Sequence, residues 1–353
     1  MKTLYLHCGY HKTGSSFLQT LFARNRDKLI KDGIYFPASE REYDMIKGNI
    51  SPGNGPELAS ALSDIDVYAS KDFLNDKFNQ AQNNKCNALL LSSEALFHSF
   101  EKRGALECLT EVCKDLDIGN IRALVYFRDP VSHSLSTYKH RAKNGNIEDL
   151  SDWLNNDYET MDLLKKFTDY RSEYPIDWTC RKYMADSEFM ARTAFVEWLN
   201  VFMPAIPEDD EVNVSLTFSE IRVIQSLKNM YPNAIDHLKR EFSNLSQYAK
   251  GHDKKLKEAY KNIAAIELQS YRKLVDKVNK SLGENEKLIL PDADNQNIKR
   301  MNPEILLSEE QIQAIGRALN SNFESDTLKS RIKNLTGKAI EKIKRLLIRK
   351  RLV

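Results

Sequence analysis

A glycine-bounded loop near the start of the chain carries the residues with the clearest potential for chemistry. Gly9 and Gly14 are separated by four residues, Lys12 lies between them, and Ser15 and Ser16 follow. Glycines let a backbone approach an anion closely, because no side chain stands in the way. The apolar run before the loop predicts a strand and the pattern after it predicts a helix, so N–H groups of the loop and the positive end of the helix form an anion site.

The position of the lysine separates this loop from the loop of nucleoside-triphosphate enzymes. Those enzymes use the pattern G-x-x-x-x-G-K-[ST], in which the lysine follows the second glycine. Here Ser15 occupies that position, and the lysine has moved back to Lys12. This displacement is the most informative departure in the sequence.

Two further predicted strands also end in charged residues. Residues 87–93 are mostly apolar and precede Glu94, and residues 121–127 precede Arg128. An arginine offers a planar fork that suits phosphate, although an ion-paired surface arginine would give the same local pattern. Because groups at the carboxyl ends of parallel strands meet at one edge of a sheet, we expect the loop, Glu94 and Arg128 to lie together.

Strands and helices alternate along the first part of the chain, which predicts an α/β fold. We expect the three-layer arrangement of the P-loop type, with a central parallel sheet flanked by helices, plus a C-terminal helical region. The expected division is a core at residues 1–230 and a helical region at residues 231–353. Residues 51–56 are rich in Pro and Gly and predict an exposed loop. The other expected strands are 3–8, 34–37 and 176–183, and the expected helices include 15–31, 104–116 and 187–202.

Composition favours a globular protein without a polyanionic partner. Hydrophobic residues make up 41% and charged residues 29% of the chain, and 52 Lys and Arg face 50 Asp and Glu, so no nucleic-acid partner is expected. The five cysteines form no C-x-x-C pair, which favours reduced thiols. His7 and His11 straddle a strand end and a loop, so no metal site is expected. With no signal-peptide pattern and no apolar run of bilayer length, we expect a cytoplasmic protein.

The last residues form a basic segment with apolar positions at helical spacing. Residues 328–353 hold ten Lys and Arg against Glu341 as the one acid. Such a helix would rest on an anionic membrane surface at the inner face of the membrane. The alternative is a docked terminal helix with a solvated basic face.

Taken together, these motifs resemble the sulfotransferases that use 3′-phosphoadenosine 5′-phosphosulfate, especially the glycan-modifying branch and its bacterial relatives. The 5′-phosphosulfate loop of that family corresponds to residues 9–16, and its 3′-phosphate motif corresponds to Arg128 and Ser136. Residues 136–140 are similar to the serine-x-tyrosine-x-histidine run of glycan N-sulfating members. The resemblance covers about residues 1–40 and 88–142. The arginine-lysine-glycine loop of the small-molecule branch is absent from the sequence, which disfavours a phenol or steroid acceptor.

The resemblance implies roles for the residues in these motifs. Lys12 would stabilise charge on the bridging oxygen of the leaving nucleotide, and no metal ion would be required. Arg128 and Ser136 would hold the 3′-phosphate. The implied donor-binding residues are Gly9, His11, Lys12, Thr13, Gly14, Ser15, Ser16, Arg128 and Ser136.

The acceptor must lose a proton as it attacks, so a base is needed near the loop. Glu94 matches the position at which family members carry the base, and His11 and His140 are competing candidates. The resemblance implies an acceptor hydroxyl or amine on a carbohydrate or glycolipid. Two other functions stay open, a P-loop kinase or other nucleotide-dependent transferase, and a non-catalytic nucleotide-binding scaffold.

Overall fold

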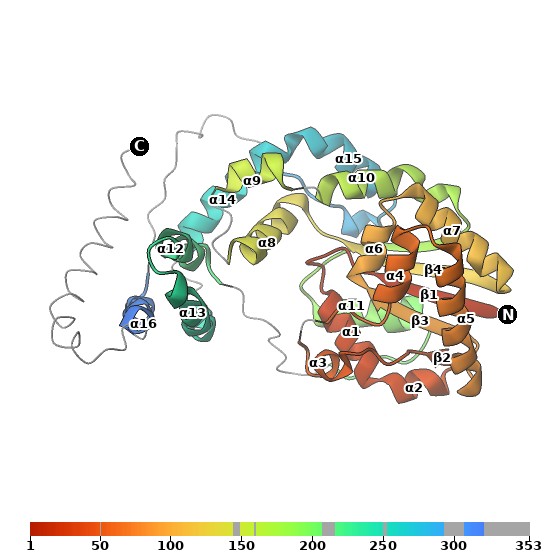
Figure 1. Cartoon of the computed structure of the whole chain (residues 1–353). Helices are drawn as coiled ribbons and strands as arrows, with labels where there is room; N and C mark the ends of the chain where they lie inside the picture. Colours follow the sequence, from red (N-terminus) through yellow and green to blue (C-terminus); the bar gives the residue numbers. More distant parts are fainter. Residues whose placement is uncertain are drawn as a thin grey trace. The chain divides into compact units, whose positions relative to one another are not determined.

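The computed structural model contains two compact units, each assembled from separate stretches of the chain (Figure 1). The expected boundary at residue 230 falls inside the second unit, because the chain passes between the units more than once. The predicted basic helix at residues 328–353 lies outside the described residues. The first unit comprises residues 1–130, 159–213 and 271–290, and the second comprises residues 131–158, 214–270 and 291–353. The structure describes residues 1–49, 51–143, 149–158, 160–206, 216–249, 253–292 and 307–320.

A sheet of five parallel strands forms the centre of the first unit. β1 (Lys2–Cys8) lies between β3 (Ala88–Ser93) and β4 (Ile118–Phe127), while β2 (Ile34–Tyr35) and β5 (Asp177–Lys182) form the edges (Figure 1). Helices cover both faces of a parallel sheet, so its inner strands read as continuous apolar runs rather than as alternating ones. The expected α/β fold is therefore confirmed.

Aromatic side chains join the helices to both faces of the sheet. On one face the ring of Tyr5 packs edge-on against Trp198, with ring centres 5.3 Å apart. On the other face Phe127 contacts Phe97 and Phe167. The helices of this unit are α1 (Ser15–Arg24), α2 (Arg26–Lys31), α3 (Glu42–Ile46), α4 (Pro56–Ser63), α5 (Val67–Asn83), α6 (Glu94–Ser99), α7 (Arg103–Asp115), α10 (Thr160–Tyr170), α11 (Ser187–Ala191), the π-helical segment η2 (Arg192–Trp198) and α15 (Arg272–Asn279).

Two of the expected helices are interrupted. The helix predicted for residues 15–31 is divided at Asn25, whose side-chain amide donates to the carbonyl oxygen of Leu21 at 2.9 Å and so competes with the helical bonding pattern. The helix predicted for residues 187–202 changes from α to π geometry after Ala191 and ends before Asn200, which has a φ of 58°. A left-handed residue cannot continue a right-handed helix.

The second unit is helical in its described part and has an aromatic core. Tyr138 contacts Trp153 and Tyr260, with ring centres 5.7 and 5.9 Å apart, and Tyr260 also packs against Phe218. Helix α12 (Phe218–Lys228) has a local cap at Thr217, and the distant carboxylate of Asp253 also accepts hydrogen bonds from the backbone N–H groups of its first turn. The helices are α8 (Pro130–Ala142), α9 (Leu150–Asn156), α12 (Phe218–Lys228), α13 (Ile235–Ala249), α14 (Lys254–Glu267) and α16 (Glu309–Asn320).

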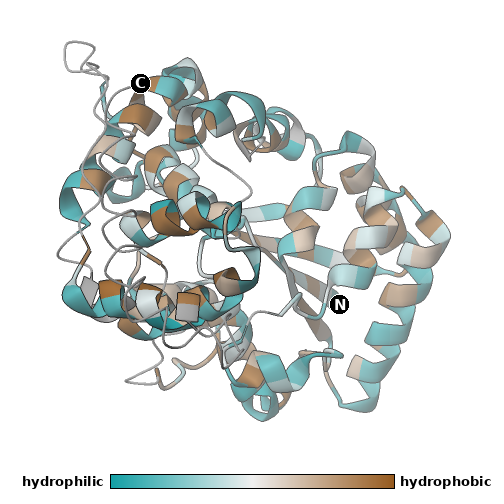
Figure 2. Cartoon of the chain, turned by 60° about the vertical axis from the view of Figure 1, so that its left-hand side comes forward, coloured by the Kyte–Doolittle hydropathy of each residue, from teal (hydrophilic) through white to brown (hydrophobic). Residues whose placement is uncertain are grey.

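The helices carry hydrophilic and hydrophobic residues on different faces, as Figure 2 shows. In α7 the residues that face the core include Leu106, Leu109 and Val112, spaced three residues apart. This spacing is typical of a helix that covers a core on one side and meets water on the other. Of the helices that the structure describes, none has the length and apolar character to cross a bilayer.

Candidate functional site

The loop after β1 has a backbone shape that its glycines and one strained residue produce. Gly14 has a φ of 79° and directly precedes α1, and Lys12 adopts a φ of 61°, which is uncommon for a residue with a side chain. Thr13 stabilises the turn by donating its hydroxyl proton to the carbonyl oxygen of Tyr10. No side chain caps the first turn of α1, so its leading N–H groups remain available to an anion in the loop.

Gly9 lets the loop approach the end of β3. Its N–H donates to the carbonyl oxygen of Ser93 at 3.1 Å, which joins the two strand ends. A β-carbon at Gly9 would lie 2.4 Å from Oγ of Ser15 and 2.8 Å from Cγ of Glu94. Ser15 and Glu94 therefore meet at this glycine, and any other residue here would push one of them aside.

Glu94 is the first residue of α6 and is half-buried. Burial raises the pKa of its carboxyl group above the ordinary value, because a charge loses hydration when it leaves water. The nearby Lys12 ammonium group and the Ser15 hydroxyl act in the opposite direction and lower that pKa. A carboxylate with a raised pKa beside a lysine and a glycine-bounded loop is better suited to accept a proton than an ordinary glutamate.

Arg128 follows β4 and is hydrogen-bonded to the same loop. Its Nη1 donates to the carbonyl oxygen of Lys12 at 2.9 Å, so the guanidinium holds the strained residue of the loop. The guanidinium carbon also lies 5.1 Å from the ring centre of Tyr183, within the range of a cation–π contact. The structure therefore brings Arg128, Lys12 and Glu94 together, as the sequence predicts for the carboxyl ends of these strands.

Tyr183 and Met190 belong to this site and were missed by sequence reasoning. Tyr183 directly follows β5, and its N–H donates to the carbonyl oxygen of Phe127 at 2.6 Å. A β-carbon at Gly14 would lie 3.1 Å from the Tyr183 ring and 2.6 Å from Cε of Met190. Tyr183 thus contacts the loop and Arg128 at once. Its position at the end of a predicted strand was the signal that would have identified it.

A pair of histidines lies beside the loop. The ring of His11 stacks on that of His98, with centres 5.8 Å apart and planes 16° apart. His98 is exposed and lies four residues after Glu94, on the same face of α6. His98 was not predicted from the sequence, and its spacing from Glu94 was the available signal.

The predicted exposed loop at residues 51–56 is in fact partly buried against β3, and the prediction for it is wrong. Asn54 is buried, and its side-chain amide donates to the carbonyl oxygens of Pro37 and Leu90, while its side-chain oxygen accepts from the N–H of Ser92 at 2.7 Å. These bonds satisfy backbone groups beside the last residues of β3. One asparagine thus fixes the segment that leads to Glu94.

His7 lies beneath the loop in the central strand and has a structural role. Its Nδ1 is 2.7 Å from the hydroxyl oxygen of Ser92, and complete burial lowers the pKa of its ring to about 4. The ring is therefore neutral at physiological pH. Within the described part of the chain, no three His, Cys, Asp or Glu side chains gather as a metal-binding group.

Two predicted site residues belong to the second unit. Ser136 is half-buried and His140 is exposed, and both lie on α8. The other predicted residues all belong to the first unit and surround the same loop. They are Gly9, His11, Lys12, Thr13, Gly14, Ser15, Ser16, Glu94 and Arg128.

Fold and site together define an α/β protein with a glycine-bounded loop at the carboxyl end of its central strand. Comparison of the chain with protein-family models, with curated proteins and with solved structures gives no match.

Proposed function

We propose that this protein is a sulfotransferase, which moves a sulfuryl group from 3′-phosphoadenosine 5′-phosphosulfate to a hydroxyl or amine of a carbohydrate or glycolipid. One observation carries the proposal. Arg128 donates to the carbonyl oxygen of Lys12, and the Lys12 ammonium group acts in turn on the Glu94 carboxyl group. In this proposal Arg128 binds the anion, Lys12 supplies a positive charge and Glu94 is the base, and all three lie at one loop.

Each of these residues has a defined part in the proposed reaction. Loop N–H groups and the start of α1 hold the 5′-phosphate. Lys12 neutralises charge that grows on the bridging oxygen as the sulfur–oxygen bond of the donor breaks. The acceptor oxygen or nitrogen forms a new bond to sulfur and gives its proton to Glu94, so the products are the sulfated acceptor and adenosine 3′,5′-bisphosphate. His11 is the alternative proton acceptor within the first unit.

Arg128 supplies the preference for a nucleotide that carries a 3′-phosphate. A guanidinium group forms two parallel hydrogen bonds with a phosphate, and its contacts with Lys12 and Tyr183 hold it in one orientation. The roles proposed for Ser136 in donor binding and for His140 as a base depend on the sequence motif alone.

A ligand-binding experiment distinguishes the proposed sulfotransferase from a P-loop kinase. Thermal unfolding of the full chain is followed with adenosine 3′,5′-bisphosphate in the presence of a chelator, and separately with ATP and Mg²⁺. A ligand that binds only the folded state raises Tm. We expect a rise with the bisphosphate that needs no metal ion. A rise with ATP and Mg²⁺ alone would favour the kinase.

An assay of sulfate transfer distinguishes the proposed sulfotransferase from a non-catalytic nucleotide-binding scaffold. Labelled donor is incubated with the protein and with glycan and lipid fractions of its host, and label in each fraction is counted. Lys12→Ala and Arg128→Ala should each abolish transfer, whereas Lys31→Ala, an exposed lysine away from the loop, should leave it unchanged. Bisphosphate binding without transfer to either fraction would favour the scaffold, and wild-type rates in both loop variants would contradict the proposed site.

A further inference from the structure

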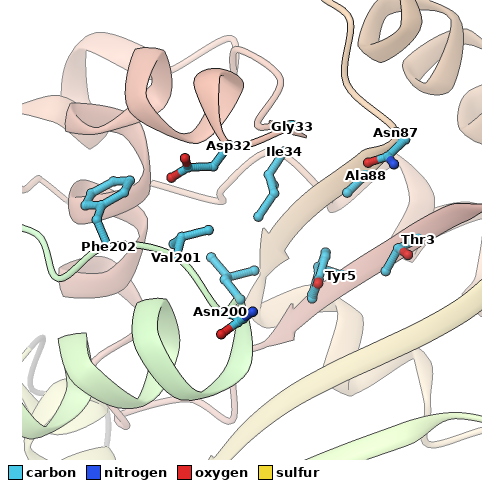
Figure 3. Close-up of a pocket in the computed structure, with 11 residues that line it drawn as sticks. Thr3, Tyr5, Asp32, Gly33, Ile34, Asn87, Ala88, Asn200, Val201 and Phe202 are labelled. Carbon is cyan, nitrogen blue, oxygen red and sulfur yellow. The ribbon is translucent and has the colours of Figure 1, made fainter.

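A pocket lies in the first unit at the amino ends of β1, β2 and β3, whereas the glycine-bounded loop follows the carboxyl end of β1 (Figure 3). Its volume of about 390 Å³ is near the lower limit of the roughly 300–1,000 Å³ of small-molecule sites. The residues of its wall come from three strands, from the end of α2 and from the segment after η2. They are Thr3, Tyr5, Asp32, Gly33, Ile34, Asn87, Ala88, Leu199, Asn200, Val201 and Phe202.

Polar side chains around this pocket have unused hydrogen-bonding capacity. Within the described part of the chain, the side chains of Asp32, Asn87 and Asn200 make no hydrogen bond or ion pair with protein groups, although the backbone of Asn87 is bonded to that of Thr3. The carboxylate offers acceptors alone, and each amide offers both donors and acceptors. These three side chains therefore present one acceptor group and two mixed groups, and the hydroxyl-bearing residues Thr3 and Tyr5 also line the wall.

Part of the wall is apolar. Ile34, Val201 and Phe202 supply aliphatic and aromatic surface, and Figure 3 shows them on the same side of the pocket as Asp32. Among the residues that the structure describes, no Lys or Arg lines the wall. Asp32 carries the one charge among the described lining residues, and a carboxylate repels phosphate and sulfate. Lys28 and Arg122 contact the rings of Phe202 and Tyr5 but are not themselves lining residues. The ligand chemistry of this pocket is therefore the opposite of that of the anion loop.

We propose that this pocket binds a neutral sugar ring. Sugar hydroxyls donate to the Asp32 carboxylate and exchange hydrogen bonds with the amides of Asn87 and Asn200. The C–H face of the ring packs against the apolar side of the wall. The inference is independent of the proposed transferase function, because it uses no residue of the donor loop.

Saturation-transfer NMR on the full chain tests the pocket directly. The probes are glucose and N-acetylglucosamine, and their tetrasaccharides maltotetraose and chitotetraose. We expect the ring protons of at least one probe to receive saturation from the protein, and the signal to fall several-fold in Asp32→Ala and in Asn87→Ala. Both positions are exposed, so the variants should fold. Asp27→Ala changes an exposed aspartate of α2 that lies outside the pocket, and it should keep the wild-type signal.

Comparison of the monosaccharide probes with the tetrasaccharide probes distinguishes a free sugar from a glycan chain as the ligand. A stronger signal from a tetrasaccharide indicates a glycan chain as the ligand, and equal signals indicate a free sugar. Adenosine 3′,5′-bisphosphate should not compete, since it is expected at the opposite edge of the sheet. Absence of saturation transfer to all four probes overturns the inference, and so does a signal that persists unchanged in Asp32→Ala and Asn87→Ala.

Discussion

The guanidinium carbon of Arg128 lies 5.1 Å from the centre of the Tyr183 ring. The two residues follow neighbouring strands, and the N–H of Tyr183 is bonded to the carbonyl oxygen of the residue before Arg128. The ring therefore has a fixed place beside the guanidinium. It limits the orientations that Arg128 can adopt before any ligand arrives, which lowers the entropic cost of binding.

Replacement of Tyr183 should weaken recognition of a 3′-phosphate selectively. Tyr183→Leu removes the aromatic face, and we expect about 2–30-fold weaker binding of adenosine 3′,5′-bisphosphate, the equivalent of about 0.5–2 kcal/mol for a cation–π contact. Binding of adenosine 5′-monophosphate, which lacks the 3′-phosphate, should change little. Tyr183→Phe is the matched control and should keep wild-type affinity for both. If Tyr183→Leu weakened the binding of both nucleotides equally, Tyr183 would support the loop rather than the recognition of the 3′-phosphate.

Glu94→Gln should remove the proposed base while preserving the shape of the site. General-base catalysis contributes about 10²–10⁴-fold, so we expect a loss of transfer rate of that order with donor affinity retained. Because burial raises the pKa of Glu94, the wild-type rate should fall with decreasing pH at a value above the ordinary range of glutamate. Initial rates across pH measure both effects. A full rate in Glu94→Gln and a large loss in His11→Ala would move the role of base to His11.

The same substitution should not reduce stability at neutral pH. The folded state raises the pKa of Glu94, so it binds the proton more tightly than the unfolded chain does. Stability from this group is present below the unfolded pKa and is lost as pH rises through the folded pKa. Ionisation of the half-buried carboxylate therefore opposes folding as pH rises through the folded pKa, whereas Gln stays neutral at every pH. We expect the Tm of Glu94→Gln at neutral pH to equal or exceed that of wild type, and a lower Tm would contradict this assignment.

Gly53→Ala should destabilise the segment that packs against β3. Gly53 has a φ of 82°, and a β-carbon there would lie 1.8 Å from the carbonyl oxygen of Ser92. Gly33→Ala is a matched control, because Gly33 has a φ of 78° and its nearest neighbour atom would be 3.7 Å away. Left-handed strain costs about 1–3 kcal/mol at either position, and only Gly53→Ala adds a collision with backbone. Urea unfolding should therefore give a clearly lower midpoint for Gly53→Ala, and equal midpoints would contradict the close approach.

Glu220 in the second unit should make stability depend on pH. Its buried carboxylate accepts hydrogen bonds from the N–H of Thr217 and from the side chain of Gln311. Burial raises the pKa of this carboxyl group, and the negative charge of nearby Asp253 raises it further. Stability should therefore decline as pH rises from the unfolded pKa of glutamate through the raised folded value. Glu220→Gln should flatten this decline in Tm. The control Glu258→Gln changes an exposed residue and should keep the wild-type profile.

The sequence alone determined the strands, the anion loop and the charged residues at the strand ends. These features are local, because a short apolar run bounded by glycine or a charge has few other stable conformations in a buried sheet. The parallel order of the strands then requires Lys12, Glu94 and Arg128 to approach one edge. That part of the site followed from spacing and strand direction.

Tertiary structure decided the contacts that join distant parts of the chain. The ring of Tyr183 beside Arg128, the bonds of Asn54 to β3 and the pocket between Asp32 and Asn200 all depend on packing between segments far apart in sequence. Residues 51–56 have the composition of a surface loop, yet the side chain of Asn54 satisfies backbone groups that would otherwise be buried without partners. The composition of a segment identifies its turn-forming residues, but only the fold determines which backbone groups form hydrogen bonds with them.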